Sequence, residues 1–364
     1  MVMKTSVFQR IFPSPKFLRM QAMGLDISDR SVRYVQLVRS RRGLKIGDFG
    51  ARRVPDDVIK EGEIKDIDGL AKAFKGLRSD LGTELVNVSL PEERAYVVKF
   101  RTPALKMSDV RTSLELQLSD HVPLSPDEAV FDYDIIGSRK KARRKELDVA
   151  LSAMPRSSVE QYLAFLSRVH LSPIALEIEA QASARAVVPR GDHGTFMVID
   201  LGEMRTGISV VEAGTVVQSS SVGIGGRSVT EAIQKTLGIG FDEAEQIKIE
   251  KGITGSKHDE KLFPAILSVV AAIRDEVSKH FLYWHTHTGH AEEKHQPVER
   301  VILCGGNAPM LGLSDYVSSG LSVEAELADV MVNIQSLDEY IPEMTFHESL
   351  QYATAIGLAL RSVQ

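Results

Sequence analysis

The sequence has little that would stabilise the chain by covalent cross-links or embed it in a membrane. Cys304 is its one cysteine in 364 residues, so a disulfide framework is excluded and a reducing compartment is expected. No apolar run approaches the roughly 20 residues that a transmembrane helix needs. Aromatic residues make up only 6% of the chain and hydrophobic residues 43%, a balance typical of a globular α/β protein. The net charge of −5 argues against nucleic-acid binding over the whole surface.

Residues 1–21 form a basic leader that has no acidic residue and no apolar core of the kind found in signal peptides. Its cations are Lys4, Arg10, Lys16 and Arg19. One interpretation is a disordered leader, or an upstream extension before a true start at Met20 or Met23. The other is a weak contact with anionic lipid, which four spread charges support poorly.

Two short stretches, residues 24–32 and 198–206, are imperfect copies of each other. In each copy a hydrophobic run ends on an aspartate, Asp26 or Asp200, and a turn and a β-rich run follow. The repeat predicts two similar lobes whose aspartates face each other across a cleft. Magnesium prefers one or two carboxylates together with water and substrate phosphates. The two aspartates therefore suit a metal-bound polyphosphate.

The residues of the two turns suit contacts with phosphate oxygens, because they offer hydroxyl groups and backbone N–H groups. Ser28 and Ser31 provide them in the first copy, and Gly202 and Thr206 in the second. The alternative is that an aspartate at a strand end only caps a turn. A matched pair of such turns favours phosphate binding.

Three further motifs follow in the second half. A glycine-rich stretch, 221–226, precedes a helix that a capping box from Ser228 to Glu231 is expected to start, which suggests an anion site at Gly225 and Gly226. Glu245 and Lys248 share one helical face and either pair with each other or contact a ribose and base.

A third motif, Gly305–Gly306, ends a strand and would let a flat ligand approach the backbone. Cys304 beside it is expected to be a core residue, because no activating base is evident. Each of these three motifs alone is also compatible with ordinary turn or helix chemistry.

Alternating strands and helices predict an α/β fold with a mixed sheet in each lobe and a break at 189–194. Residues from about 102 to 154 are expected to form an inserted α+β subdomain, with a helix from Ser108 and two strands. Between these strands, residues 139–145 contain six basic side chains. A solvated hairpin tip is the favoured interpretation, and contact with phospholipid headgroups or an acidic partner is the alternative.

Five of the ten histidines lie between His280 and His295. Their spacing could suggest a metal site. No cysteine or aspartate completes a ligand set, so no metal is expected there.

The motifs in this order resemble the actin-like ATPase superfamily. Within it, the chain resembles the PilM family of type IV pilus assembly, a relative of the division protein FtsA. Four stretches carry that choice: 24–37, 121–133, 222–226 and 356–361. The resemblance spans about residues 22 to 361, and the ordered set is more specific than any one motif.

The resemblance implies two facing lobes of ribonuclease-H-like topology that bind ATP and Mg²⁺. Lobe 1 would span 22–194 with the insertion, and lobe 2 would span 195–364. Lobe 2 would include a base-binding helical region at about 228–296 and a C-terminal helix that returns to lobe 1. Asp26 and Asp200 would hold magnesium through water and orient a hydrolytic water. The implied nucleotide contacts are Ser28, Asp29, Ser31, Gly202, Thr206, Gly225, Gly226, Glu245, Lys248, Gly305 and Gly306.

The resemblance also implies partners. The chain would bind the cytoplasmic N-terminal peptide of a PilN-like inner-membrane protein near the insertion, and other pilus or secretion platform proteins. Self-association is a further expectation. The protein would be cytoplasmic, at the inner face of the cytoplasmic membrane, and would reach that membrane only through partners.

The chain departs from the family pattern in both phosphate turns. Ser28 stands where the family usually has glycine, and the second turn contains Glu203, Met204 and Arg205 in place of small or hydroxyl residues. Glu203 would repel phosphate, whereas Arg205 could compensate. We therefore expect at most slow ATP hydrolysis.

Three other functions stay open on the sequence. A small-molecule kinase of the same superfold needs a general base, and no extra acid in the turns serves as one. An FtsA-like protein would carry an amphipathic membrane helix after a linker, whereas this chain stops at Gln364, just after its closing helix. The third is a degenerate fold that binds no nucleotide.

Overall fold

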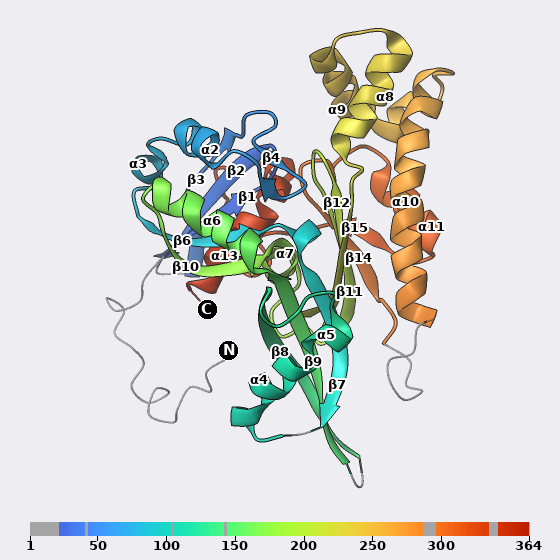
Figure 1. Cartoon of the computed structure of the whole chain (residues 1–364). Coiled ribbons are helices and arrows are strands. Elements are labelled where there is room, and N and C mark those ends of the chain that lie inside the picture. Colours follow the sequence, from blue (N-terminus) through green and yellow to red (C-terminus); the bar gives the residue numbers. More distant parts are fainter. Residues whose placement is uncertain are drawn as a thin grey trace. The chain divides into compact units, whose positions relative to one another are not determined.

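The computed structural model describes residues 22–40, 43–103, 105–141, 144–286, 296–334 and 341–363, with the side chains of 137–145 left out. The chain divides into two compact units. The first comprises Met1–Ala182 and Thr354–Gln364, and the second comprises Ser183–Ala353. Figure 1 labels the elements of both units.

The first unit is built on a five-stranded mixed sheet of order β10-β6-β1-β2-β3. Strands β1, β2 and β3 pair antiparallel, whereas β1, β6 and β10 pair parallel. Every residue of β1 is buried, which explains its continuous hydrophobic character. The bounds are β1 Met23–Ile27, β2 Ser31–Ser40, β3 Gly43–Arg53, β6 Leu85–Leu90 and β10 Ser172–Ile178.

Helices pack against this sheet to form one hydrophobic core. Asp66 caps helix α2 by accepting a hydrogen bond from the Gly69 N–H group at 2.9 Å. Phe74 and Phe165 meet edge to face with ring centroids 6.2 Å apart. The smaller elements are α2 Ile67–Ala73, α3 Leu77–Leu81, α6 Arg156–Arg168, α7 Glu179–Val187, β4 Ile59–Lys60, β5 Glu63–Ile64 and η2 Glu92–Arg94.

The C-terminal helix α13, Ala353–Arg361, approaches the first sheet at Gly24 and helix α7 at Gly357. A Cβ atom on Gly24 would overlap the backbone of Ala355 and Ala359, and one on Gly357 would overlap the Ala182 carbonyl of α7. The Asn87 side chain donates to the Leu358 carbonyl at 2.9 Å. The helix therefore lies so close to the sheet and to α7 that side chains at the two glycines are excluded.

The insertion has a sheet and a core of its own within the first unit. Its sheet has the order β7-β9-β8, and Phe100, Val110, Leu114 and Val149 belong to a separate buried cluster. The helix expected from Ser108 begins one residue earlier, at Met107. The bounds are β7 Tyr96–Pro103, α4 Met107–Leu116, α5 Leu118–His121, β8 Ala129–Lys141 and β9 Arg144–Pro155.

The basic run 139–145 falls on the β8–β9 hairpin, whose residues 142 and 143 lie outside the described part of the chain. Its hairpin placement is as expected. The solvated tip and the contact site both stay predictions.

The second unit repeats the sheet plan of the first. Its five strands have the order β13-β12-β11-β14-β15, with an antiparallel trio and then parallel pairing of β11, β14 and β15. The sequence repeat is therefore a repeat of hairpins, β1–β2 and β11–β12. The bounds are β11 Thr195–Leu201, β12 Thr206–Glu212, β13 Thr215–Val222, β14 Arg300–Cys304 and β15 Ala325–Leu327.

Helices of the second unit present apolar stripes to each other and to the sheet. In α10 the buried side chains Leu262, Ile266, Val270, Ile273 and Val277 recur every three or four residues. The bounds are α8 Gly226–Leu237, α9 Phe241–Ser256, α10 Leu262–Thr286, α11 Leu313–Leu321, α12 Phe346–Ser349 and η3 Leu350–Tyr352.

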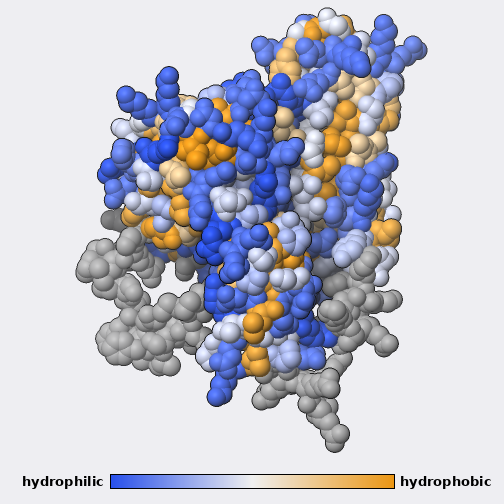
Figure 2. Space-filling view, viewed as in Figure 1, coloured by the Kyte–Doolittle hydropathy of each residue, from blue (hydrophilic) through white to orange (hydrophobic). Residues whose placement is uncertain are grey.

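Among the residues that the structure describes, no helix is both long and apolar enough to span a bilayer. On the face shown in Figure 2, hydrophobic residues form separate patches among hydrophilic ones.

We predict that Gly357→Ala destabilises the protein. Alanine in a helix interior normally gains about 1 kcal/mol over glycine. Here the new Cβ atom meets the Ala182 carbonyl, and such overpacking typically costs about 1–3 kcal/mol. Urea unfolding followed by circular dichroism measures the net loss. Gly223→Ala is the matched control, because a Cβ atom there meets nothing within 4 Å. Equal unfolding midpoints for the two variants would contradict the packing of α13.

Candidate functional site

The second aspartate turn closes β11 onto β12 in the second unit. The Gly202 N–H group donates to the Arg205 carbonyl at 2.9 Å, and Asp200 lies opposite Gly207 in the antiparallel register. Gly305 follows the neighbouring strand β14 with a φ of +90°, and a Cβ atom on it would overlap the Asp200 carboxylate and the Leu201 backbone. Position 305 therefore requires glycine, because the groups beside it leave no room for a side chain.

Gly306 differs from its neighbour. It is exposed, and a Cβ atom on it would make only an ordinary contact, 3.6 Å from Gln351. Of the predicted pair, Gly305 therefore shapes the turn, whereas Gly306 leaves open surface that a ligand can approach.

Asn307 joins the motifs of the second unit, and the sequence reasoning missed it. Its Nδ2 donates to the Gly202 carbonyl at 2.9 Å, and its Oδ1 accepts from Lys248 Nζ at 2.7 Å. Its backbone N–H group donates to the Leu201 carbonyl at 3.0 Å. One side chain therefore ties the aspartate turn, the glycine pair and helix α9 together. An asparagine directly after two glycines at a strand end was the available signal.

Lys248 is the buried charge of this junction, with 4% of its surface exposed. Its ammonium donates to Glu245 at 2.8 Å, to Asn307, and to the Gly226 carbonyl at 3.3 Å. The three donors of a lysine are thus all used. The Thr230 hydroxyl also donates to Glu245. The predicted shared face of Glu245 and Lys248 is confirmed, and the two side chains form an ion pair.

The glycine-rich turn before α8 packs tightly on the aspartate turn. Cβ atoms on Gly225 and Gly226 would overlap the Glu203 backbone and the Asn307 side chain, respectively. The Gly226 N–H group donates to the Gly202 carbonyl at 3.0 Å, and the Arg227 N–H group to the Glu203 carbonyl at 2.8 Å. Because these amides have acceptors, they are not free to bind an anion.

The capping box predicted from Ser228 to Glu231 is wrong. Helix α8 begins at Gly226, after an N-cap at Gly225 that makes no side-chain cap. The close approach of the glycines lets the helix start three residues earlier than the box predicts, with its N-cap at Gly225 and not at Ser228. Glu231 instead accepts from Arg227 Nε at 2.8 Å.

Glu203, the acid that would repel a phosphate, lies 3.6 Å from the Arg227 guanidinium. The same guanidinium stacks on the Phe241 ring at 5.0 Å. Arg227 therefore offsets part of the Glu203 charge, a contribution that the sequence reasoning assigned only to Arg205.

The first aspartate turn, in the first unit, has its own supports. Asp26 is 7% exposed and accepts from the Ser89 hydroxyl at 2.9 Å, while Ser89 Oγ accepts from the Ile27 N–H group at 2.8 Å. The Ser28 N–H group donates to the Ser31 carbonyl at 2.9 Å, which closes the turn. Ser89, on β6, was not identified from the sequence.

Arg33 is a cation of this turn that sequence reasoning also missed. It lies directly opposite Asp26 in the β1–β2 register, and its guanidinium donates to Ser31 Oγ. A basic residue two positions after Ser31 on the outgoing strand was the signal that could have found it.

Two predicted contact residues have local structural partners. The Asp29 carboxylate accepts from the Glu61 and Gly62 N–H groups, each at 3.1 Å, and so links the turn to the β4–β5 hairpin. Thr206 is fully buried, and its hydroxyl donates to the Ile224 carbonyl at 2.7 Å. In this arrangement both residues shape the turns.

The histidine cluster is only partly described, because His287, His290 and His295 lie outside the described residues. Burial lowers the pKa of His280 below its usual value. His285 Nδ1 lies 2.7 Å from the Phe281 carbonyl. In the described part of the chain, no three potential ligands gather around a metal position.

Comparisons with known proteins give the family of this chain and the solved structures with a similar fold. The family model of the type IV pilus assembly protein PilM matches residues 24–363. A solved PilM–PilN type IV pilus biogenesis complex is similar with a TM-score of 0.76 and 19% identity, covering 95% of this chain and 99% of that chain.

Two further solved structures are more distant. Ethanolamine utilization protein EutJ from Carboxydothermus hydrogenoformans has a TM-score of 0.54 and 17% identity, covering 93% of this chain and 89% of that one. MreB5 of Spiroplasma citri bound to AMPPNP has a TM-score of 0.53 and 12% identity, with coverage of 93% and 94%.

These structural likenesses confirm the predicted actin-like α/β fold. The family model covers nearly all of the described chain, which decides between the pilus-assembly family and the two rival classes, FtsA-like proteins and small-molecule kinases. The chain belongs to the family of the type IV pilus assembly protein PilM.

Proposed function

We propose that this actin-like protein is an ATP-binding scaffold of the type IV pilus assembly platform, placed at the inner face of the cytoplasmic membrane by a PilN-like partner. The proposal that the protein binds a nucleotide rests on the hydrogen bonds made by Asn307, which we call the Asn307 junction. It brings Gly202 of the aspartate turn and the α9 residues Glu245 and Lys248 into one hydrogen-bonded network beside the glycine pair.

The nucleoside end of this site is supported by Glu245 and Gly306. The Glu245 side chain is 36% exposed, and we propose that its carboxylate contacts a ribose hydroxyl. Gly306 leaves room for a flat base against the backbone. Lys248 is almost fully buried and acts as a positioning residue that holds the Glu245 carboxylate and Asn307 in place.

The phosphate end is supported by Asp200 and by the turn from Gly202 to Thr206. Bound Mg²⁺ would supply charge neutralisation for the phosphates, with Asp200 contacting it through water. We extend the proposal to the Asp26 hairpin because it repeats this construction in the first unit. There Arg33, which lies opposite Asp26, is the cation suited to a phosphate oxygen.

Hydrolysis is proposed to be slow. Glu203 places a carboxylate in the second turn, and Arg227 offsets it at 3.6 Å. Asp26 is also held in place by a hydrogen bond from the Ser89 hydroxyl. ATP would then act chiefly as a bound ligand that holds the scaffold in one state.

The partner part of the proposal rests on the family and on the PilM–PilN complex. That neighbour was solved as a complex with PilN, and it covers 95% of this chain. We propose that this chain binds the cytoplasmic N-terminal peptide of a PilN-like inner-membrane protein. Contacts with other platform proteins and with further copies of the chain would extend that assembly.

We predict that Mg²⁺–ATP binds the wild-type chain and that Asp200→Ala weakens binding at least about tenfold, which corresponds to about 1.4 kcal/mol. Isothermal titration calorimetry measures both affinities. Asp242→Ala, at an exposed carboxylate in the first turn of α9, is the control and should leave the affinity unchanged. Equal heats for wild type and Asp200→Ala would refute the assignment of this turn.

We predict that Asn307→Ala lowers both stability and ATP affinity, because it leaves Lys248 Nζ and the Gly202 carbonyl short of a partner. The stability loss should be about 1–3 kcal/mol. Asn333→Ala is a matched control from the same unit, because Asn333 also makes three hydrogen bonds, to Arg190, Arg185 and Val188, away from the nucleotide motifs.

Denaturant unfolding and ATP titration should therefore separate the two asparagine variants. Both should lose stability, and only Asn307→Ala should lose ATP affinity beyond what unfolding explains. An ATP affinity that falls equally in both variants would contradict the site.

We predict that the protein floats with liposomes only when they display a PilN-like N-terminal peptide. Co-flotation on a sucrose gradient measures this, with a scrambled peptide as the control. Strong flotation with bare liposomes would overturn recruitment through a partner.

A further inference from the structure

The Glu203 carboxylate lies on the surface of the second aspartate turn, next to the start of α8. Its side chain is 43% exposed and lies 3.6 Å from the Arg227 guanidinium. The Glu203 carbonyl also accepts a hydrogen bond from the Arg227 N–H group at 2.8 Å. These contacts place a negative charge beside the turn to which we assign the phosphates of ATP.

Arg227 offsets only part of this charge, because two carboxylates share its guanidinium. Arg227 Nε donates to Glu231 at 2.8 Å, whereas its Nη1 lies 3.6 Å from Glu203 Oε1, beyond hydrogen-bond distance. The guanidinium also lies over the Phe241 ring, 5.0 Å from its centroid. Glu231 is therefore the closer acidic partner of this cation.

The ionised side chains of the turn and of the start of α8 sum to a negative charge. Residues 200–206 and 226–231 contain three carboxylates and two guanidinium groups, a difference of one negative charge: Asp200, Glu203, Glu231, Arg205 and Arg227. Like charges near a binding site lower its affinity for an anion. This part of the site therefore does not favour a further phosphate group.

The backbone at the start of α8 does not compensate for this charge. An open helix N-terminus attracts anions through its free N–H groups. Here the N–H groups of Gly226 and Arg227 donate to the carbonyls of Gly202 and Glu203. The first amides of the helix are thus bonded to the turn itself.

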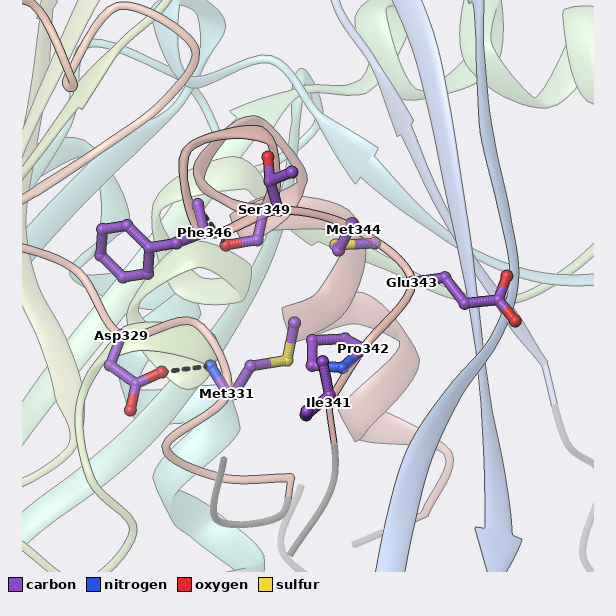
Figure 3. Close-up of a pocket in the computed structure, with 9 residues that line it drawn as sticks. Asp329, Met331, Ile341, Pro342, Glu343, Met344, Phe346 and Ser349 are labelled. Carbon is purple, nitrogen blue, oxygen red and sulfur yellow. Dashed lines mark hydrogen bonds between the residues drawn. The ribbon is translucent and has the colours of Figure 1, made fainter. Parts of the chain in front are cut away.

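The cavity drawn in Figure 3 lies outside the nucleotide motifs of the second unit and is not suited to phosphates. Its volume is about 420 Å³, and its nine lining residues include Asp329 and Glu343 but no lysine, arginine or histidine. Figure 3 shows the Met331 side chain pointing toward Pro342 and Ile341, which form part of an apolar wall. An apolar wall without a cation disfavours an anion. The aspartate turn therefore stays the assigned position of the phosphates.

We propose that Glu203 is a specificity-determining residue of the nucleotide site and shifts its preference from the triphosphate toward the diphosphate. This inference rests on the proposed ATP site. A nucleoside triphosphate carries one more negative charge than the diphosphate when magnesium is bound to both. Because Coulomb repulsion grows with the charge of the ligand, Glu203 penalises ATP more than ADP. The protein then binds ADP at least as tightly as ATP.

A second magnesium ligand is the other role that a carboxylate in this turn could have. Within the residues that the structure describes, no three potential ligands gather around a metal position. The Arg227 guanidinium lies 3.6 Å from the Glu203 carboxylate, and a neighbouring cation disfavours a divalent metal there. Repulsion of phosphate is therefore the role that these contacts favour.

Calorimetric titration of the full chain with Mg²⁺–ADP and with Mg²⁺–ATP tests the proposal through the ratio of the two dissociation constants. Glu203→Gln removes the charge and keeps the size of the side chain, so it should shift the ratio at least about threefold toward ATP. Arg227→Gln removes the partial offset and should shift the ratio toward ADP. Added salt should weaken both shifts, because exposed charges are screened.

Glu260→Gln is the matched control, because it removes the charge of an exposed glutamate in the loop between α9 and α10 of the same unit. It should leave the ratio unchanged. A ratio that Glu203→Gln also leaves unchanged would overturn the inference while the nucleotide site stands. Weaker binding of both nucleotides to Glu203→Gln would overturn it as well and assign Glu203 to magnesium. A wild-type chain that binds neither nucleotide would refute the proposed function, and the inference with it.

Discussion

The second unit depends on one buried ammonium group. Lys248 is held by Glu245, Asn307 and the Gly226 carbonyl, so it connects α9, the start of α8 and the loop after β14. A buried charge is tolerated only when its partners satisfy it, and removing one partner costs far more than the pair contributes. Lys248 is therefore linked to the aspartate turn through Asn307, whose side chain also donates to the Gly202 carbonyl.

The glycines are the second constraint, because they let the aspartate turn, the glycine-rich turn and the loop after β14 approach closely. Gly225, Gly226 and Gly305 each lie where a Cβ atom would overlap one of the other two segments. Close packing at glycines recurs in the first unit, where Gly24 lets α13 approach the sheet and Gly357 lets it approach α7. Both units thus combine an aspartate hairpin with glycine-mediated packing. The nucleotide site that we propose lies on the surface next to these closely packed turns.

The sequence predicted the features that depend on local pattern: the repeated hairpins, the insertion, the mixed sheets and the shared face of Glu245 and Lys248. The sequence reasoning missed Asn307, Ser89 and Arg33, because their roles arise from partners distant in the chain or across a strand pair and the local signals for Asn307 and Arg33 do not show those partners. The capping box at Ser228 failed for the same reason, since tertiary contacts of Gly226 set the start of α8. Asp29 and Thr206 have the chemistry expected of phosphate ligands, yet their partners are backbone groups of neighbouring turns.

The Asn307 junction forms part of the nucleotide site that we propose. Hydrogen–deuterium exchange with and without Mg²⁺–ATP reports the position of nucleotide binding as well as binding itself. We expect protection at residues 200–206, 241–250 and 303–310, with little change at residues 329–349. Saturating nucleotide that leaves those three segments unprotected, or that protects only residues elsewhere, would contradict the proposed site.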